Sequence, residues 1–165
     1  MLLEVLSLMV LAGATSDPCS SLPSREAQLT CNFLLSEQEG ERVERLLEEV
    51  IEATPEPDQT FGIPVKEELR ESQRLWEEYS DTACAASGHR TGGPVGGVHD
   101  SFEGYNTYFR CLRESQAQRS LFLWREYGLT GPEPTPITDV EWPEGMSERG
   151  PFERIPPTGD AAGTR

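Results

Sequence analysis

The sequence is poor in positive charge, in histidine and in long apolar runs, and each shortage argues against a class of function. There are 14 lysines and arginines against 29 aspartates and glutamates, which gives a net charge of −15. A surface of this sign repels the phosphate backbone, so we expect no nucleic-acid partner. The apolar run at the start is far shorter than the ~20 residues needed to cross a bilayer, so we expect no membrane span.

Signatures of catalysis and metal binding are also scarce. The two histidines, His89 and His99, lie in a glycine-rich stretch, and no serine has a Gly-x-Ser-x-Gly context. A zinc site formed by these histidines with Cys84 and Cys111 is an alternative, but the spacings match no compact zinc pattern. We therefore expect no enzymatic activity, no cofactor and no metal.

The four cysteines constrain the fold most strongly. An even number in a short chain with an apolar start indicates two disulfides in an oxidising compartment. Sequence alone leaves three pairings open. We favour Cys19–Cys31 and Cys84–Cys111, because each pair closes a short local loop.

The first residues resemble an export signal. The stretch Leu2–Leu11 is mostly apolar, and Ala12-Gly13-Ala14 has the small-x-small form of a cleavage site. We expect a signal peptide over residues 1–14, cleaved after Ala14, and a mature protein that is periplasmic or secreted.

Helical periodicity predicts an all-α domain over residues 15–127. Apolar stripes predict three helices, from about residue 24 to 53, 65 to 86 and 102 to 127. Ser24 is the predicted N-cap of the first, and Gly40 allows a kink or break within it. The prediction is a small bundle of about three helices stapled by two disulfides.

Glycine and proline mark two further segments as irregular. The loop 87–101 holds five glycines and Pro94, which argues against regular structure. Residues 128–165 hold seven of the 13 prolines. This composition predicts a Pro-rich, acidic, disordered tail. A short docking motif or a contact with the body is the alternative for three of its apolar residues, Trp142, Phe152 and Ile155.

The second helix has an inner face with an unusual set of residues. Gln73, Trp76, Tyr79 or Ser80, and Cys84 fall three or four residues apart and share that face. We interpret Trp76 and Tyr79 as core residues rather than a ligand platform. Gln73 is predicted to be a buried hydrogen-bonding residue.

Charged residues give the first two helices a negative surface. Residues 24–53 carry eight acidic and three basic side chains, and residues 65–81 carry six and three. Glu37, Glu39 and Glu41 alternate with a period of two, which scatters them around a helix, so we interpret them as a solvated face rather than calcium ligands.

Asp81 is predicted to lie near the C-terminal end of the second helix, where a carboxylate opposes the helix dipole. Such a residue needs a compensating partner. We expect it to pair with Arg113 or Arg119 on the third helix.

This pattern of residues resembles the lysozyme inhibitor LprI-like family, a family of small, exported, helical bacterial domains. The resemblance covers about Cys19 to Leu123 and rests on these positions: Cys19, Glu26-Ala27, Cys31, Gln73, Trp76, Tyr79, Asp81, Cys84, Gly92-Gly93, Cys111-Leu112 and Arg119. It implies the same local cysteine pairing and a cell-envelope setting. It also implies inhibition of lysozyme as a candidate activity.

The chain departs from the family pattern at several positions. The family commonly has Arg before the Asp of the motif, an Asp, a Leu-Asn pair and a Tyr in the first helix, and a Thr after the last cysteine. The corresponding residues here are Ser80, Gly40, Val43-Glu44, Leu47 and Gln116.

Two hypotheses of function follow. The first is an exported LprI-like protein that binds and inhibits lysozyme, with the loop Ser87–Asp100 entering the active-site cleft and His89, Arg90 and His99 as its polar groups. The second is a cell-envelope interaction module without inhibitory activity that binds another cationic protein or peptide.

Overall fold

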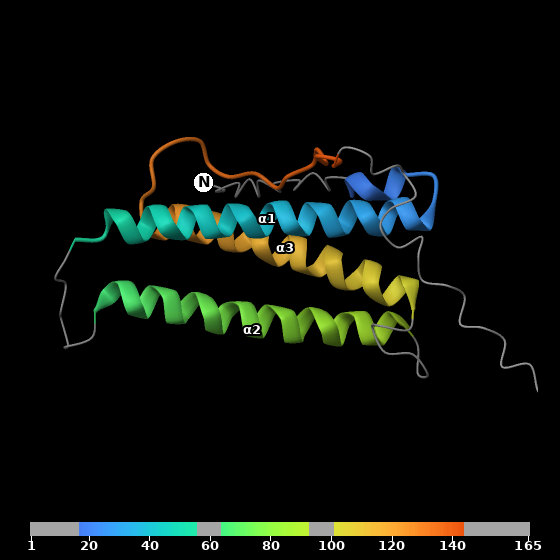
Figure 1. The fold of residues 1–165 in the computed structure, drawn as a ribbon, viewed down its shortest axis with the longest axis horizontal. Helices are drawn as coiled ribbons and strands as arrows, with labels where there is room; N and C mark the ends of the chain where they lie inside the picture. Colours follow the sequence, from blue (N-terminus) through green and yellow to red (C-terminus); the bar gives the residue numbers. More distant parts are fainter. Residues whose placement is uncertain (1–16, 56–63, 93–100, 144–165) are drawn as a thin grey trace, which may run out of the picture.

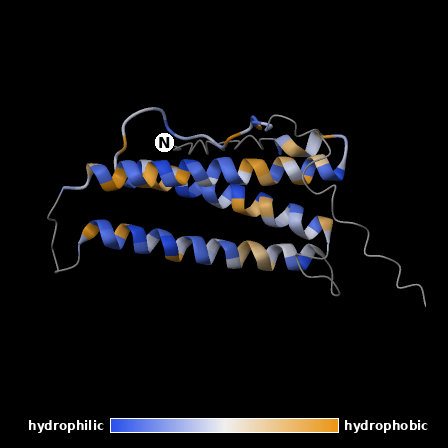
Figure 2. Ribbon diagram, in the orientation of Figure 1, coloured by the Kyte–Doolittle hydropathy of each residue, from blue (hydrophilic) through white to orange (hydrophobic). Residues whose placement is uncertain are grey.

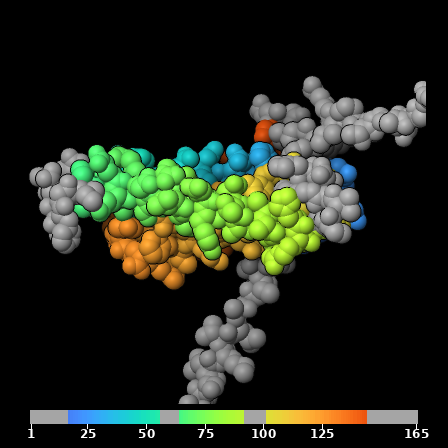
Figure 3. All heavy atoms as spheres, turned by 90° about the horizontal axis from the view of Figure 1, so that it is seen from below, coloured from blue at the N-terminus to red at the C-terminus, as the bar shows by residue number. Residues whose placement is uncertain are grey.

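The structure is a computed structural model that describes residues 17–55, 64–92 and 101–143. A short 3₁₀ helix, η1 (Pro18–Ser21), precedes three long helices, α1 (Arg25–Ala53), α2 (Val65–Gly92) and α3 (Phe102–Glu126). α3 packs along both α1 and α2, whereas α1 and α2 make few direct contacts (Figure 1). With α2 facing the viewer, α1 lies along one of its edges and the C-terminal half of α3 along the other (Figure 3). The predicted all-α bundle of about three helices is confirmed.

Serine side chains start two of the helices. The Ser24 hydroxyl accepts a hydrogen bond from the Ala27 N–H at 3.0 Å, which confirms the predicted N-cap of α1. Ser101 caps α3 in the same way, through the Gly104 N–H at 2.9 Å. Each hydroxyl satisfies one of the N–H groups that the first turn of a helix leaves without an intrahelical partner.

The end of α3 turns the chain back along the bundle. Gly128 follows the C-cap and has a φ of +63°, in the left-handed region that glycine adopts without a Cβ penalty. The N–H of Leu129 then donates to the Trp124 carbonyl at 3.1 Å, which is the outer hydrogen bond of a Schellman motif. This turn sends the following residues back over α1 (Figure 1).

The apolar core consists of two separate clusters. One joins all three helices near the α1–α2 connection, and its buried members are Val43, Leu47, Val50, Ile51, Leu69 and Leu123. The other surrounds the first disulfide, where Cys19, Cys31 and Leu35 are buried. Hydrophilic residues predominate along much of α2, with hydrophobic residues at its start (Figure 2). A small, divided core is the setting in which disulfides add most to stability.

Both predicted disulfides are confirmed. Cys19 is bonded to Cys31, and Cys84 is bonded to Cys111. The first bond ties η1 to α1, and the second ties α2 to α3. The alternative zinc site is thereby weakened, because Cys84 and Cys111 are bonded to each other and present no thiolates.

Three expectations about regular structure need correction. α1 is continuous through Gly40, without a break. α2 extends to Gly92, so the first part of the predicted irregular loop is helical. The chain after α3 was predicted to be disordered from residue 128, but residues 128–143 have a described course and contact both apolar clusters through Leu129, Ile137 and Val140. The predicted signal peptide, loop residues 93–100 and residues 144–165 lie outside the described residues.

Candidate functional site

The sequence left open whether Tyr79 or Ser80 lies on the inner face of α2, and the structure places Ser80 there. Ser80 is buried, and its hydroxyl lies 3.1 Å from the Ser115 hydroxyl of α3. Tyr79 is 72% exposed, so its prediction as a core residue was wrong. The two residues differ by 100° around the helix, and the position of α3 decides between them.

Three of the motif residues converge on one contact between α2 and α3. Gln73 is buried, and its side-chain oxygen accepts a hydrogen bond from Arg119 Nε at 3.0 Å. The Arg119 guanidinium also lies 5.5 Å from the centre of the Trp76 ring and 5.1 Å from that of Phe122. Such cation–π contacts are worth about 0.5–2 kcal/mol, depending on how far they are desolvated. Burial lowers the pKa of Arg119, an effect that Tyr127 and Glu77 oppose.

Asp81 has a different partner from the one expected. It accepts a hydrogen bond from the Tyr108 hydroxyl, so the predicted pairing with Arg113 or Arg119 was wrong. The pKa of Tyr108 is raised, first by burial and then by the Asp81 carboxylate. The contact links α2 to α3 three residues before the Cys84–Cys111 disulfide.

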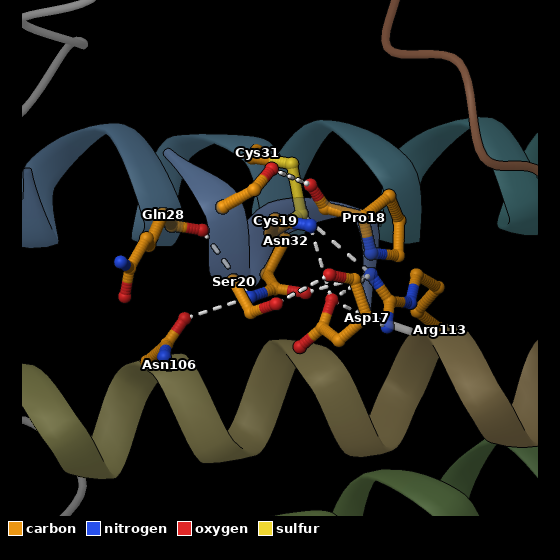
Figure 4. A network of polar contacts seen from close by, with 10 residues as sticks. Asp17, Pro18, Cys19, Ser20, Gln28, Cys31, Asn32, Asn106 and Arg113 are labelled. Carbon is orange, nitrogen blue, oxygen red and sulfur yellow. Dashed lines mark hydrogen bonds and ion pairs between the residues drawn. A yellow bond between two sulfur atoms is a disulfide. The ribbon is translucent and has the colours of Figure 1, made fainter. Parts of the chain in front are cut away.

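Arg113 instead joins α3 to the start of the described chain. Its guanidinium lies 3.2 Å from Asp17 Oδ1 and donates to Asn32 Oδ1 at 2.9 Å (Figure 4). Asn32 in turn donates to Asn106 Oδ1 at 2.8 Å. These contacts lie beside the Cys19–Cys31 disulfide, and Arg113 and Asn32 are both buried. A buried charge with this many partners is a structural clamp.

An acidic groove lies between α1 and α2. It has a volume of about 280 Å³, and α3 contributes one residue, Gln116. Its complete lining is Ser36, Glu37, Gly40, Glu41, Val43, Glu44, Gln73, Trp76, Glu77 and Gln116. Four glutamates and no basic residue therefore line the groove. Two motif residues, Gln73 and Trp76, lie in its α2 wall.

Gly40 and Gln116 lie close together in the lining of this groove. A Cβ added at Gly40 would lie 3.1 Å from the amide end of Gln116. With its amide oriented to donate, Gln116 reaches the Ser36 carbonyl at 2.8 Å. The absence of a side chain at Gly40 therefore gives the longer residue room beside α1.

A second, shallower hollow continues the acidic surface along α1. It is lined by Glu41, Glu44, Arg45, Leu47, Glu48, Glu49 and Glu52, and it shares Glu41 and Glu44 with the acidic groove. The two hollows together present seven glutamates and one arginine. Overlapping fields of one sign attract a cationic partner over a distance of about one Debye length, ~8–10 Å at moderate salt.

Glu39 lies on the opposite side of α1 and is fully buried, so its interpretation as part of a solvated face was wrong. Its carboxylate accepts a hydrogen bond from the Ile137 N–H at 2.7 Å and pairs with Arg42. Burial raises the pKa of Glu39, while Ile137, Arg42 and Arg113 oppose that rise. An arginine three residues after a glutamate was the one sequence signal for this pair.

The predicted binding loop is described only in part. His89 and Arg90 are exposed in the last turn of α2, and His99 lies outside the described residues. Within the described ranges, no group of three His, Cys, Asp or Glu residues could hold a metal ion. None of the helices in those ranges is long and apolar enough to cross a membrane.

Comparisons with protein-family models, curated proteins and solved structures find no match to this chain. The fold and the site define its class on their own. It is a three-helix protein with two disulfides and an acidic groove between two of its helices.

Proposed function

We propose that this chain is an exported, non-catalytic protein that binds a cationic protein through its acidic groove, and that the partner is lysozyme. The observation that carries the proposal is the composition of the groove, whose lining includes four glutamates and no basic residue. Carboxylates are suited to lysine and arginine side chains, with which they form charge-assisted hydrogen bonds.

The wider charge distribution supports this mode of binding. The glutamates of the second hollow extend the negative surface along α1 beyond the acidic groove. Complementary charge raises the rate of association more than it strengthens the final complex. A partner recognised in this way should bind more weakly as salt increases.

We name lysozyme as the specific partner because the sequence resembles the lysozyme inhibitor LprI-like family. Lysozymes are generally cationic, and the motif residues Gln73 and Trp76 lie in the wall of the groove. For inhibition, part of the protein must also cover the active-site cleft. The segment Ser87–Asp100 remains our proposal for that part, and its first residues belong to the end of α2, where His89 and Arg90 are exposed.

Export is supported by the disulfides. Two bonded cysteine pairs fit an oxidising environment outside the cytosol. The proposed signal peptide over residues 1–14 would deliver the chain to the periplasm or the medium.

Inhibition of cell-wall lysis by lysozyme is the direct test, with protein in which both disulfides have formed. We expect inhibition that weakens between about 50 and 200 mM salt. The informative variant is Glu37→Gln/Glu44→Gln in the groove, and the matched control is Glu67→Gln/Glu68→Gln, two exposed glutamates of α2 outside both hollows. Two exposed ion pairs at 0.2–1 kcal/mol each predict a loss of about 2- to 30-fold for the groove variant. Equal losses in both variants would remove the groove from the proposal.

A second candidate function is a non-inhibitory interaction module of the cell envelope. Three of the positions that depart from the family pattern, Gly40, Val43-Glu44 and Gln116, line the acidic groove. A changed groove favours a changed cationic partner. Salt-dependent binding of lysozyme without inhibition, or binding of another cationic protein in its place, would support this candidate over the first.

A further inference from the structure

The segment that follows α3 is held to the bundle through its backbone. We call residues 129–143 the return segment, which runs back along α1 (Figure 1). The Ile137 N–H donates to Glu39 at 2.7 Å, and Arg42 donates to the Thr135 carbonyl at 2.6 Å. These two hydrogen bonds involve no side chain of the return segment.

Burial along the return segment repeats every third residue. Pro134, Ile137 and Val140 are half-buried, while the residues between them are exposed. A period of three is that of the polyproline II helix, which has three residues per turn and no internal hydrogen bonds. Prolines at 132, 134 and 136 favour that conformation.

The surface beneath the return segment is apolar beside the first disulfide and mixed in polarity beside α3. Ile137 and Val140 pack, as Leu22 does, against the buried cluster formed by Cys19, Cys31 and Leu35. A pocket of about 340 Å³ lies beside Pro134 and Pro136, and its lining outside the return segment comes from the start of the described chain and from α3: Asp17, Pro18, Arg113, Glu114, Ala117, Gln118 and Leu121. No residue of the return segment is fully buried. This pocket is open to solvent on one side, so the bundle encloses the return segment only in part.

The polar groups of the groove are held in place by the bundle itself. Arg42 pairs with Glu39 and also donates to the Ser120 hydroxyl of α3 at 3.3 Å. The acceptor and donor that contact the return segment are therefore oriented by α1 and α3. Any extended chain with a carbonyl and an N–H in the same relative positions would satisfy both.

We propose that the α1–α3 groove is a binding site for proline-rich, extended peptides with an apolar residue at every third position, and that residues 132–140 occupy it as an intramolecular ligand. A segment of the same pattern in a partner protein displaces them. Backbone hydrogen bonds supply the general recognition and the period-three side chains supply the selectivity, while a preformed polyproline II segment loses little conformational entropy on binding. This site is distinct from the acidic groove and does not depend on lysozyme binding.

The energetics of displacement set what an experiment should detect. A tethered segment competes at an effective concentration in the millimolar range. Only molecules in which the groove is empty can bind a free peptide, so the apparent affinity is the intrinsic affinity multiplied by the fraction of such molecules. A change that weakens only the tethered copy should therefore strengthen the binding of a free peptide.

The test uses the full chain and a fluorescein-labelled synthetic peptide with the sequence of residues 130–143. Ile137→Asp removes the central apolar anchor of the tethered copy. Thr138→Asp is the matched control, because it makes the same charge change at the next residue, which lines the pocket but has an exposed side chain. We expect the peptide to bind the Ile137→Asp chain about tenfold or more tightly than it binds the wild-type or Thr138→Asp chain. A peptide with aspartate in place of its isoleucine should not bind.

A second measurement needs no variant of the protein. Hydrogen exchange of the Ile137 amide should be slow in the wild-type chain, because the amide donates to a buried carboxylate. Saturating unlabelled peptide should make that amide exchange faster while the amides of α2 are unchanged. The proposal is wrong if the peptide binds the Ile137→Asp and Thr138→Asp chains equally, or if saturating peptide leaves Ile137 exchange unaltered.

Discussion

Replacing either Glu39 or Arg42 alone should lower the free energy of unfolding more than replacing both together, which should lower it by much less than the sum of the two single changes. The Glu39 side chain is 0% exposed and that of Arg42 is 16% exposed. Removing one member of a buried pair leaves the other charge uncompensated, at a typical cost of about 3–5 kcal/mol. We expect Glu39→Leu to cost about 3 kcal/mol, at the lower end, because Arg42 keeps Ser120 and the Thr135 carbonyl as acceptors.

Arg42→Met should cost about 3–5 kcal/mol, because the Glu39 carboxylate loses its ion-pair partner and keeps the Ile137 N–H as a hydrogen-bond donor. The double variant removes both charges from the same buried space. It loses the two hydrogen bonds to the return segment, at about 1 kcal/mol each, but has no unpaired charge. We therefore expect a total cost of about 2 kcal/mol, well below the sum of the single changes.

The assay is urea unfolding followed by circular dichroism at neutral pH, with both disulfides intact. The matched control is the same pair of substitutions at Glu71 and Arg74, which have the same spacing on α2 but are both 57% exposed. Exposed ion pairs contribute little to the free energy of unfolding, so the costs of the two single substitutions at Glu71 and Arg74 should add up to the cost of the double substitution. Additive costs at Glu39 and Arg42 as well would refute the reasoning that burial controls this pair.

Two further predictions concern the same helix. Burial raises the pKa of Glu39 above its usual value of 4.5, so the folded chain binds the Glu39 proton more tightly than the unfolded chain does. The resulting stabilisation is fully present below pH 4.5 and is lost as the pH rises through the raised pKa of the folded state. Urea unfolding at a series of pH values should show this change in the wild type, and Glu39→Gln should lack it. Gly40→Ala should gain less than the ~1 kcal/mol of helix propensity, because the new Cβ would lie 3.1 Å from Gln116. The full gain should appear in a Gln116→Ala background, by the same unfolding assay.

The helices and disulfides could be predicted because their signals are local. Apolar residues three and four apart define α1, and each disulfide joins cysteines that are near in sequence, at separations of 12 and 27. The choice between Tyr79 and Ser80 was not local, because both fit a helical stripe. Only the placement of α3, which brings Ser115 to Ser80, settles it.

The buried charges could not be predicted because their partners are distant in sequence. Arg113 pairs with Asp17, 96 residues away, and Glu39 accepts from Ile137, 98 residues away. The return segment was missed for a related reason. Its composition is that of a disordered tail, and its period of three matches neither a helix nor a strand. Such a segment is ordered by the groove that receives it.

α1 therefore separates two kinds of acidic residue by their angle around the helix. Glu37, Glu41 and Glu44 face the acidic groove, whereas Glu39 faces the return segment. Glu39 follows Glu37 by two residues, or about 200° of rotation, so the two point to opposite sides. Neutralising Glu37 and Glu44 should weaken binding of a cationic partner with little effect on stability, and changing Glu39 should affect stability and the return segment. The two proposed sites can therefore be tested independently, even though one helix carries both.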